Sequence, residues 1–265
     1  MTWEEAVLWL RKQPDKAALV KDCFYDDPLT GAAERYYTSS EWQAVRTYLP
    51  HPPGKALDLG AGRGISSYAL ARDGWDVVAL EPDASDIVGA GAIRRLATES
   101  DCSISVVQER GERLPFPDGT FDVVYCRQVL HHARDLTQLC REISRVLKKE
   151  GIFVATREHV ITKRKDLQVF LDNHPLHHLC GGEHAYTLKE YRSAIVSGGL
   201  TIRKILGPYD SDINLFPSAK DEMKTGFSAK YGIAMPTFLF NLVLVVLKIR
   251  NRTPGRLYSF VGYKE

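Results

Sequence analysis

From residue 55 to residue 156 the chain alternates short apolar runs with longer segments of helical periodicity. Apolar runs of this length are typical of buried strands when turn residues bound them. Strands that alternate with helices predict a parallel sheet with helices on both faces, which is an α/β fold. We expect strands at 56–59, 76–81, 104–108, 121–126, 152–156, 200–206 and 257–263, and helices at 65–72, 85–99, 136–147 and 187–198.

The remaining segments surround this alternating core. Residues 1–50 are helical in pattern and then irregular, and the prolines and glycine at 50–54 end them. We expect 1–50 to form a helical N-terminal cap that belongs to the same unit as the main domain, residues 51–265. Two stretches depart from the alternation and are predicted to be insertions, at about 159–186 and at about 208–255.

The composition is that of an ordinary folded domain. The chain has 265 residues, of which 44% are apolar and 26% charged, with 35 Lys and Arg against 33 Asp and Glu for a net charge of +2. These values exclude a disordered chain, a collagen-like repeat and a coiled coil. A nearly neutral chain without a basic stretch interleaved with aromatic residues gives no reason to expect a nucleic-acid partner.

The cysteines and the N-terminus bear on the cellular location. The five cysteines are widely spaced, without a C-x-x-C pair, which favours reduced core thiols over a disulfide or zinc framework. The N-terminal residues MTWEE lack the positive start and apolar run of a signal peptide. We therefore expect a cytoplasmic protein. The cysteines are Cys23, Cys102, Cys126, Cys140 and Cys180.

A turn with closely spaced glycines follows the first expected strand. Gly60, Gly62 and Gly64 stand in a G-x-G-x-G pattern, and Asp58 precedes them in the strand. Glycines between a strand and a helix let a ligand approach the backbone, because no Cβ atoms obstruct it. Glu81, at the end of the second strand, can accept hydrogen bonds from both hydroxyls of an adenosine ribose. The pattern predicts a cofactor that contains a nucleoside.

The spacing of the glycines distinguishes between two such cofactors. A dinucleotide site has the pattern G-x-G-x-x-G, but Ile65 occupies its last position here. The G-x-G-x-G turn with its acidic partner resembles motif I of the class I S-adenosylmethionine (SAM)-dependent methyltransferases. Segments 109–122, 126–132 and 147–153 resemble the family's later motifs in the same order. The resemblance covers about 54–206 and the final strand, and it is closest to the small-molecule branch that includes ubiquinone-biosynthesis-type enzymes.

The resemblance implies a fold and a cofactor. The family's fold is a Rossmann-like, doubly wound sheet of seven strands, mostly parallel, with the last strand antiparallel. In the family, the methionine part of SAM lies over the glycine turn, the ribose on the acid after strand two, and the adenine beside the segment before strand four. Carried over to this sequence, the cofactor-binding residues are Asp58, Gly60, Ala61, Gly62, Gly64, Glu81, Pro82, Gly111, Glu112 and Arg127.

The implied reaction is methyl transfer to a small-molecule acceptor by in-line attack on the sulfonium methyl group, and the family slightly favours oxygen acceptors. A base is needed only where the acceptor must lose a proton. His131 and His132 follow the fourth strand, at the edge where open α/β sheets bind ligands, and are candidate bases. The alternative is that this Leu-His-His segment caps a helix and forms the wall of the site.

A second group of histidines lies at 174–184, within the string NHPLHHLCGGEH. Imidazole, thiolate and carboxylate groups are suitable metal ligands, but their spacing here fits no established zinc finger. Gly181 and Gly182 suggest a mobile loop, which would lie over the acceptor side of the cofactor. We favour a substrate-facing lid, with His178 as a further catalytic candidate, over a purely structural segment, and we assign no metal.

The run FLFNLVLVVL at 238–247 is apolar except for Asn241, and four basic residues follow it. About 20 apolar residues are needed to cross a bilayer, so this run is too short. An apolar helix followed by basic residues can lie in a membrane interface or hold a lipid-linked acceptor, which would give a peripheral membrane contact through 236–256. We favour the alternative, a helix that packs on the domain or forms a homodimer contact.

Two other classes of function stay open. A protein that binds SAM without turnover, a scaffold, would keep the cofactor residues and lose the acceptor pocket. A nicotinamide-dependent oxidoreductase would use the same kind of sheet, although Ile65 argues against it. The aromatic residues of the cap either close over the cofactor or pack the cap itself. They are Tyr25, Tyr36, Tyr37 and Trp42.

Overall fold

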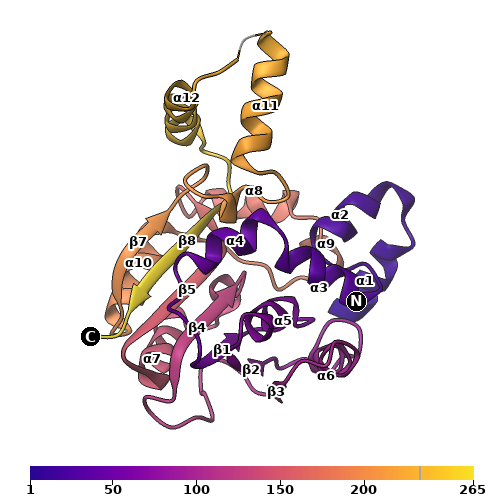
Figure 1. The fold of residues 1–265 in the computed structure, drawn as a ribbon, viewed down its shortest axis with the longest axis vertical. Coiled ribbons are helices and arrows are strands. Elements are labelled where there is room, and N and C mark those ends of the chain that lie inside the picture. Colours follow the sequence, from indigo (N-terminus) through magenta and orange to yellow (C-terminus); the bar gives the residue numbers. More distant parts are fainter. Residues whose placement is uncertain (233) are drawn as a thin grey trace.

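A sheet of eight strands forms the centre of the molecule. Figure 1 shows this sheet with helices around it in the computed structural model, which describes residues 1–232 and 234–265. The order across the sheet is β3-β2-β1-β4-β5-β8-β7, and β6 pairs with β5 outside this path. The strands are β1 (Lys55–Leu59), β2 (Asp76–Leu80), β3 (Ile104–Val107), β4 (Phe121–Arg127), β5 (Leu147–Ile161), β6 (Tyr186–Thr187), β7 (Thr201–Leu206) and β8 (Arg256–Tyr263).

Most neighbouring strands in the sheet are parallel. β1 pairs in parallel with both β2 and β4, so the strand order reverses between β1 and β4. β8 runs antiparallel between β5 and β7. The expected Rossmann-like, doubly wound α/β fold with an antiparallel last strand is therefore confirmed. A reversal of strand order leaves a crevice at the carboxyl ends of the strands, where such sheets bind ligands.

The expected count of seven strands is wrong by one. β5 continues to Ile161, beyond the expected end at residue 156, and its last two residues pair with the two-residue strand β6. The extension follows a bulge between Ala155 and Glu158, where Arg157 has a φ of +60°. The apolar pattern did not indicate this extension, because a bulge shifts which residues of a strand face the core.

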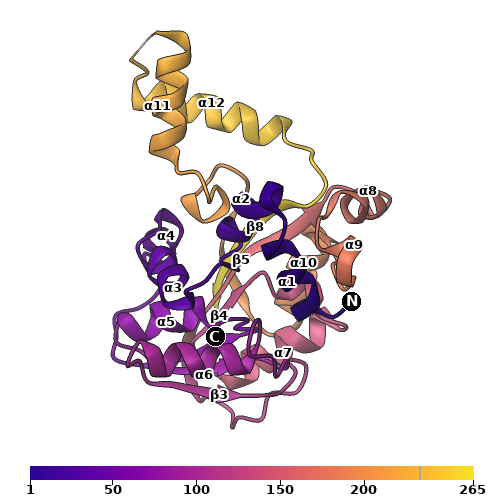
Figure 2. The same cartoon turned by 90° about the vertical axis from the view of Figure 1, so that its right-hand side faces the viewer.

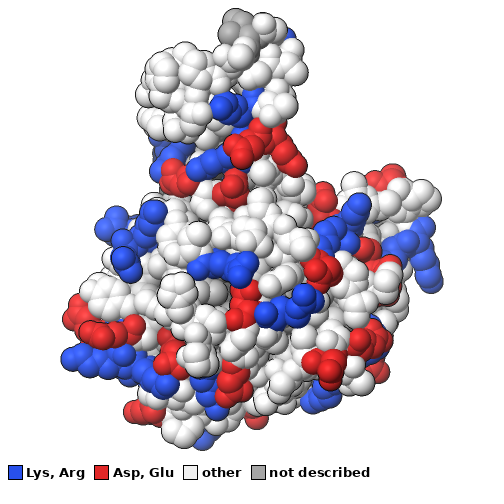
Figure 3. All heavy atoms as spheres, viewed as in Figure 1, with Lys and Arg blue, Asp and Glu red and all other residues white. Residues whose placement is uncertain are grey.

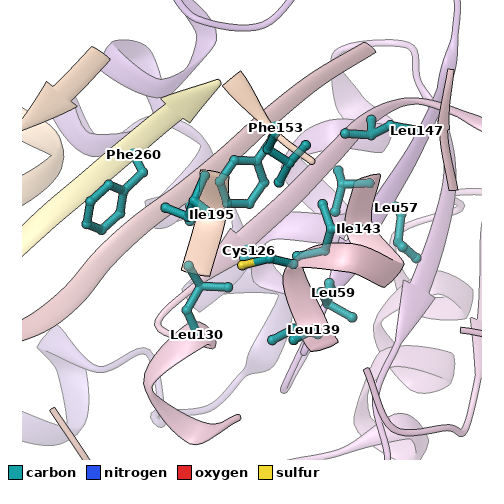
Figure 4. Packing of buried hydrophobic residues seen from close by; sticks show 14 of the residues in the cluster. Leu57, Leu59, Cys126, Leu130, Leu139, Ile143, Leu147, Phe153, Ile195 and Phe260 are labelled. Carbon is teal, nitrogen blue, oxygen red and sulfur yellow. The ribbon is translucent and has the colours of Figure 1, made fainter. Parts of the chain in front are cut away.

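Two helices cover one face of the sheet. α7 (Leu136–Val146) and α10 (Leu188–Ser197) pack on apolar side chains of β1, β4 and β5. Figure 4 shows this cluster, in which Leu139 and Ile143 of α7 belong with Leu59 of β1. The apolar residues of α7 recur at helical spacing, and the Asp135 side chain caps its first turn. The packing of this helix follows from the sequence pattern.

Four helices cover the opposite face, and two of them belong to the N-terminal segment. Tyr36 and Trp42 are fully buried there, and the Tyr36 hydroxyl lies 2.9 Å from the hydroxyl of Tyr125 in β4. The N-terminal segment is thus helical and shares a hydrophobic core with the sheet. The four helices are α3 (Leu29–Tyr37), α4 (Ser40–Arg46), α5 (Ile65–Arg72) and α6 (Ala90–Glu99), and the segment begins with α1 (Trp3–Arg11), η1 (Pro14–Lys16) and α2 (Ala17–Asp22).

Helical segments occupy both expected insertions. The first, between β5 and β6, contains α8 (Asp166–Asn173) and α9 (His177–Cys180). The second, between β7 and β8, contains η3 (Asp212–Asn214), α11 (Lys220–Tyr231) and α12 (Thr237–Arg250). Figure 2 shows α11 and α12 extending away from the sheet, so the second insertion forms a projection from the body of the molecule.

α12 packs little on the domain, which was one of its two expected uses, the other being a homodimer contact. Phe240 and Leu244 are its only buried residues, whereas Phe238 and Ile249 are 66% and 63% exposed. Apolar residues lie on all sides of this helix. Packing on one side therefore leaves the apolar residues of the other sides exposed to water. Figure 3 shows the outer part of the projection as mostly uncharged. α12 is too short to cross a membrane, and no other helix in the described part of the chain qualifies.

Candidate active site

A cavity of about 490 Å³ opens at the carboxyl ends of β1, β2, β4 and β5. It lies at the crevice where the strand order of the sheet reverses. The glycine turn and Glu81 line one part of the cavity, and histidines that follow β4 and β5 line another. The N-terminal segment contributes Trp3, Phe24 and Tyr25 to the wall. The fold therefore brings the sequence motif, the cap and the histidines to one place.

The glycine turn presents bare backbone to this cavity. Gly60 and Gly62 have φ angles of +67° and +53°, in the left-handed region that favours glycine. A Cβ atom added to Gly62 would meet no atom within 4 Å, so the backbone there faces open space. A Cβ atom on Gly60 would instead lie 2.7 Å from Val129 Cγ2. Gly60 thus allows close packing against the loop after β4, and Gly62 allows a ligand to approach.

Glu81 lies beside this turn, at the end of β2. Its Oε2 accepts a hydrogen bond from the Gly62 N–H at 2.8 Å, and its Oε1 accepts one from the Asp83 N–H at 2.9 Å. Burial raises the pKa of this carboxyl to about 7. Each carboxylate oxygen has two lone pairs, so one on each oxygen stays free for a donor in the cavity. That arrangement suits a pair of ribose hydroxyls.

Asp58 and Gly64 support the turn from outside the cavity, and neither lines it. Asp58 Oδ2 accepts hydrogen bonds from the hydroxyls of Ser66 and Ser67 at 2.8 and 2.6 Å, which ties β1 to the first turn of α5. Burial raises the pKa of Asp58 to about 6. Gly64 has a φ of +84° and is the N-terminal cap of α5. In this structure, both residues therefore stabilise the conformation of the glycine turn.

Four further residues that were predicted to bind the cofactor reach the cavity, and two of them, Gly111 and Glu112, were expected beside the adenine. Ala61, Pro82, Gly111 and Glu112 all line it. Gly111 packs closely on α7, because a Cβ atom at this position would lie 2.6 Å from Leu139 Cδ1. A larger residue would displace the segment from α7 and change the cavity wall. The structure therefore brings these four residues to the same cavity as the glycine turn.

Arg127 also lines the cavity, but its guanidinium is engaged within the protein. Its Nε and Nη2 atoms donate to the Glu41 carboxylate at 2.7 and 3.0 Å, and Nη1 donates to Gln128 Oε1 at 3.1 Å. The Glu41 side chain is completely buried. These three hydrogen bonds link α4 to the end of β4 and occupy three of the five N–H donors of Arg127.

The turn is also tied to the cap through Arg63. Its Nη1 donates to the carbonyl oxygens of Phe24 and Asp26 at 2.7 and 2.9 Å, and its Nη2 lies 2.6 Å from Asp27 Oδ1. Phe24 and Tyr25 are thereby held over the cavity next to the glycine turn. This geometry agrees with a cap that covers a bound cofactor.

The far part of the cavity is surrounded by imidazole and carboxyl groups from three segments: the loop after β4, the end of β5 and the loop before β6. Most of these side chains are buried. We refer to them as the histidine–carboxylate cluster, which consists of His131, His132, Glu158, His159, His174 and Glu183.

His131 is the most enclosed histidine of the cluster. Its Nδ1 lies 2.7 Å from Glu158 Oε2, and its Nε2 lies 3.6 Å from Glu183 Oε2. Burial alone lowers the pKa of His131, but Glu158 and Glu183 outweigh it and raise the pKa to about 9. A histidine that already carries a second proton near neutral pH cannot accept another, so this environment disfavours His131 as the general base.

His132 has a different environment. Its ring centroid lies 4.1 Å from that of His131, and its Nδ1 lies 3.1 Å from the Gly182 carbonyl oxygen. Because a carbonyl oxygen can only accept, Nδ1 carries the hydrogen and Nε2 holds the lone pair. Burial and the neighbouring His131 lower the pKa of His132. His132 lines the cavity and stays the candidate base of the two.

The histidines predicted at 174–184 separate in the structure. His174 lines the cavity, whereas the exposed His178 lies outside its lining, with Nε2 2.7 Å from the Asp172 carbonyl oxygen. His159 lines the cavity, and Glu158 supports His131 from behind it, although neither was predicted from the sequence. The signal for them was the polar triplet Arg157-Glu158-His159 directly after the apolar residues 152–156.

A family model described as a methyltransferase domain matches residues 57–155. This stretch runs from β1 through the glycine turn into β5, and it contains all the predicted cofactor-binding residues. The chain carries a class I SAM-dependent methyltransferase domain. The cofactor of this domain is SAM.

The chain is similar to several curated proteins. It is 32% identical over 111 residues to the uncharacterized methyltransferase YcgJ of Bacillus subtilis, a match that covers 38% of this chain and 39% of YcgJ. It is 25% identical over 197 residues to the ubiquinone biosynthesis O-methyltransferase of Azorhizobium caulinodans, with 68% of this chain and 77% of that protein covered. The match with YcgJ is therefore confined to less than half of each protein.

Solved structures share the fold of the methyltransferase domain. The geranyl diphosphate C-methyltransferase of Streptomyces coelicolor, in complex with Mg²⁺, geranyl diphosphate and S-adenosyl-L-homocysteine, superposes with a TM-score of 0.62 at 15% identity, over 91% of this chain and 85% of that one. YcgJ superposes with a TM-score of 0.57 at 20% identity, over 85% and 98%. At such identities the likeness concerns the fold alone.

The residues of the methyltransferase domain fit SAM. The open space at Gly62 and the free lone pairs of Glu81 lie in one cavity with Gly111 and Glu112. The glycine turn would hold the methionine part, Glu81 the ribose, and the segment at 111–112 the adenine. When bound, SAM supplies a methyl group on a sulfonium cation, and the protein's part is to orient that group toward the acceptor.

Proposed function

We propose that the chain transfers the methyl group of SAM to a small-molecule acceptor, with oxygen favoured as the acceptor atom. The observation that carries this proposal is one shared cavity, because all members of the histidine–carboxylate cluster except Glu158 line the same cavity as the glycine turn and Glu81. An acceptor hydroxyl oxygen forms a bond to the methyl carbon while the carbon–sulfur bond breaks. The products are a methyl ether, S-adenosylhomocysteine and the proton of the hydroxyl.

The names of relatives support the choice of acceptor atom. Several of them, among them the Azorhizobium protein, are ubiquinone biosynthesis O-methyltransferases. The polar side chains around the cavity suit an acceptor that must lose a proton, since buried imidazole and carboxyl groups can hold or move one. The five cysteines are all free in the structure, which supports a cytoplasmic place of action.

The test is a two-part measurement on the full chain. Calorimetry compares SAM, S-adenosylhomocysteine and NAD, and we expect binding of the first two only. Mass spectrometry then follows release of S-adenosylhomocysteine with phenols, hydroquinones, carboxylic acids and amines as acceptors, and we expect turnover with a hydroxyl compound. Binding of NAD without SAM would point to an oxidoreductase. Binding of SAM with no turnover on any acceptor class would point to a SAM-binding scaffold.

A lipid-linked acceptor at a membrane surface is a second candidate, which the exposed apolar residues of α12 favour. Basic residues lie in the last turn of this helix, at Lys248 and Arg250, and just after it, at Arg252. One relative is named 2-methyl-6-phytyl-1,4-hydroquinone methyltransferase, from Synechocystis, at 31% identity over 138 residues, 51% of this chain and 40% of that protein. An apolar helix next to basic residues binds anionic lipid surfaces, so α12 would bring the cavity to such an acceptor. A homodimer contact through α12 is the competing use of the same surface.

A further inference from the structure

We propose that His131, His159 and Glu183 bind a divalent transition-metal ion, with zinc as the best match, on the acceptor side of the cavity. One ligand atom from each of these three side chains lies within 4.8 Å of the others, and all three residues are buried. They come from the loop after β4, from β5 and from the loop before β6. The metal site itself does not depend on the proposed function, whereas its use in methyl transfer does.

Both histidines are oriented with the same nitrogen free. The Nδ1 of His131 lies 2.7 Å from Glu158 Oε2, and the Nδ1 of His159 lies 2.9 Å from the Gly255 carbonyl oxygen. The carbonyl oxygen and the ionised Glu158 carboxylate can only accept hydrogen bonds, so both Nδ1 atoms carry hydrogen. The Nε2 atoms are therefore the available metal ligands. Metal-bound histidines typically donate their second N–H to a carboxylate or a backbone carbonyl in this way.

Glu158 acts as a fixed support for His131 in this arrangement. Its Oε1 accepts hydrogen bonds from the N–H groups of Val129 and Leu130, both at 3.0 Å, and its Oε2 accepts one from the His131 N–H at 3.1 Å. A completely buried carboxylate held by three backbone donors stays ionised and does not rotate freely. Glu158 therefore fixes the ring of His131 and its tautomer, as a positioning residue.

The distance between His131 Nε2 and Glu183 Oε2 suits a shared ion better than a direct bond. At 3.6 Å it is longer than an ordinary hydrogen bond. Two ligands at about 2.0–2.2 Å from a tetrahedral zinc ion lie roughly 3.4 Å apart. His174 Nε2 lies 3.9 Å from the same Glu183 oxygen, and its Nδ1 is buried without a hydrogen-bond partner among the described residues. His174 thus lies beside Glu183 at the edge of the site, and the group of three ligands does not include it.

The charge of the cluster also favours a divalent cation. Glu158 and Glu183 are two buried carboxylates, and no Lys or Arg in the described part of the chain lies within ion-pair distance of either. Buried charges are costly unless they are paired. A proton on His131 balances one of them, whereas a divalent ion balances both. Two imidazoles and one carboxylate suit zinc and its neighbours, while Mg²⁺ and Ca²⁺ prefer oxygen ligands.

The ion would face the acceptor. His131, His159, His174 and Glu183 all line the cavity that holds the glycine turn at its other end. A site with three protein ligands leaves a coordination position open to a small molecule. An acceptor hydroxyl bound there would have a lower pKa and a fixed orientation, and both effects favour attack on a methyl group.

The test measures zinc binding by the full chain without reference to turnover. After dialysis against a chelator, calorimetry with ZnCl₂ is expected to give one tight equivalent per chain, and MgCl₂ none. Glu183→Gln, which keeps the side chain's shape, and His159→Ala are each expected to weaken zinc binding by on the order of 100-fold. The control is His178→Ala, in α9 of the same insertion but outside the cavity, which is expected to keep the wild-type affinity.

Substitution with Co²⁺ reports on the ligands directly, because a tetrahedral site with nitrogen ligands gives an intense visible spectrum that Glu183→Gln is expected to change. Wild-type zinc affinity in Glu183→Gln, or loss of zinc in His178→Ala alone, would overturn the proposal, since the ion would then sit elsewhere. SAM affinity is measured on the same samples. If the wild type binds SAM but not zinc, the metal site alone is refuted. If it binds zinc but not SAM, the proposed function alone is refuted.

Discussion

The Glu81 carboxylate accepts a hydrogen bond of 2.8 Å from the Gly62 N–H across the turn that follows β1. The two most informative features of the sequence, the glycine pattern and the acid at the end of the next strand, are therefore in direct contact. The contact fixes the carboxylate at the edge of the open space above Gly62, and it leaves lone pairs for a ligand.

Replacing Glu81 by Ala is expected to weaken SAM binding by about 100-fold or more. The variant removes two charge-assisted hydrogen bonds to the ribose, and hydrogen bonds to charged groups contribute roughly 1.5–3 kcal/mol each. Calorimetry with SAM measures the change. Glu99→Ala, on the exposed end of α6, is the control and should bind like the wild type. Unchanged affinity in Glu81→Ala would show that the ribose lies elsewhere.

SAM affinity is expected to fall as the pH drops below about 7. Burial raises the pKa of Glu81 to about 7 in the free protein, and ribose hydroxyls donate to the ionised form. Above this pKa the carboxylate is ready to accept, and below it each pH unit costs about tenfold in affinity. The dissociation constant is measured from about pH 8 to about pH 5.5. Glu81→Gln should have a much flatter profile, and an equal slope in that variant would assign the effect to another group.

His132→Ala is expected to lower the turnover number by on the order of 100-fold while SAM affinity stays near that of the wild type. The reason is that the lone pair of its Nε2 is the candidate proton acceptor at the acceptor end of the cavity. Steady-state kinetics and calorimetry on the same variant separate the two effects. His51→Ala, at an exposed site before β1, is the control. An unchanged turnover number would return His132 to a structural role.

Glu41→Gln is expected to destabilise the fold by about 3 kcal/mol. Glu41 is completely buried, and it pairs with Arg127 at 2.7 Å and lies 3.8 Å from Arg157. Removing one partner of a buried ion pair leaves an uncompensated charge in the core. Urea unfolding followed by circular dichroism measures the change. Glu99→Gln removes only an exposed pair and should cost less than about 1 kcal/mol. Similar losses in both variants would contradict this account of Glu41.

Val245→Asp is expected to reduce flotation of the protein with anionic liposomes. Val245 is 52% exposed on α12, and a charge there opposes insertion of the apolar surface into the interface. Val196→Asp is the matched control, because Val196 is 60% exposed on α10, away from the projection. The absence of wild-type flotation with any lipid composition would exclude the membrane contact. Size-exclusion chromatography of both variants then tests the homodimer alternative.

The sequence by itself determined the order of the elements and the cofactor end of the site. Strands and helices follow from the spacing of apolar residues, as in α7, and this spacing is local information. The glycine turn is likewise local, because Gly60 and Gly62 adopt φ angles that other residues rarely take. Glu81 could be assigned to the cofactor end from the sequence, because a carboxylate at the end of the second strand lies next to this turn in any sheet of this kind.

The tertiary structure alone decided the acceptor end. His131, His159 and Glu183 are far apart in the chain and meet because β4 and β5 are neighbours and a bulge shifts the end of β5. It also decided that Arg127 pairs with Glu41, and that α12 leaves most of its apolar surface in water. The physical reason is the same in each case. Apolar periodicity indicates that a residue is buried, but its partners depend on strand order, register and the packing of segments distant in sequence.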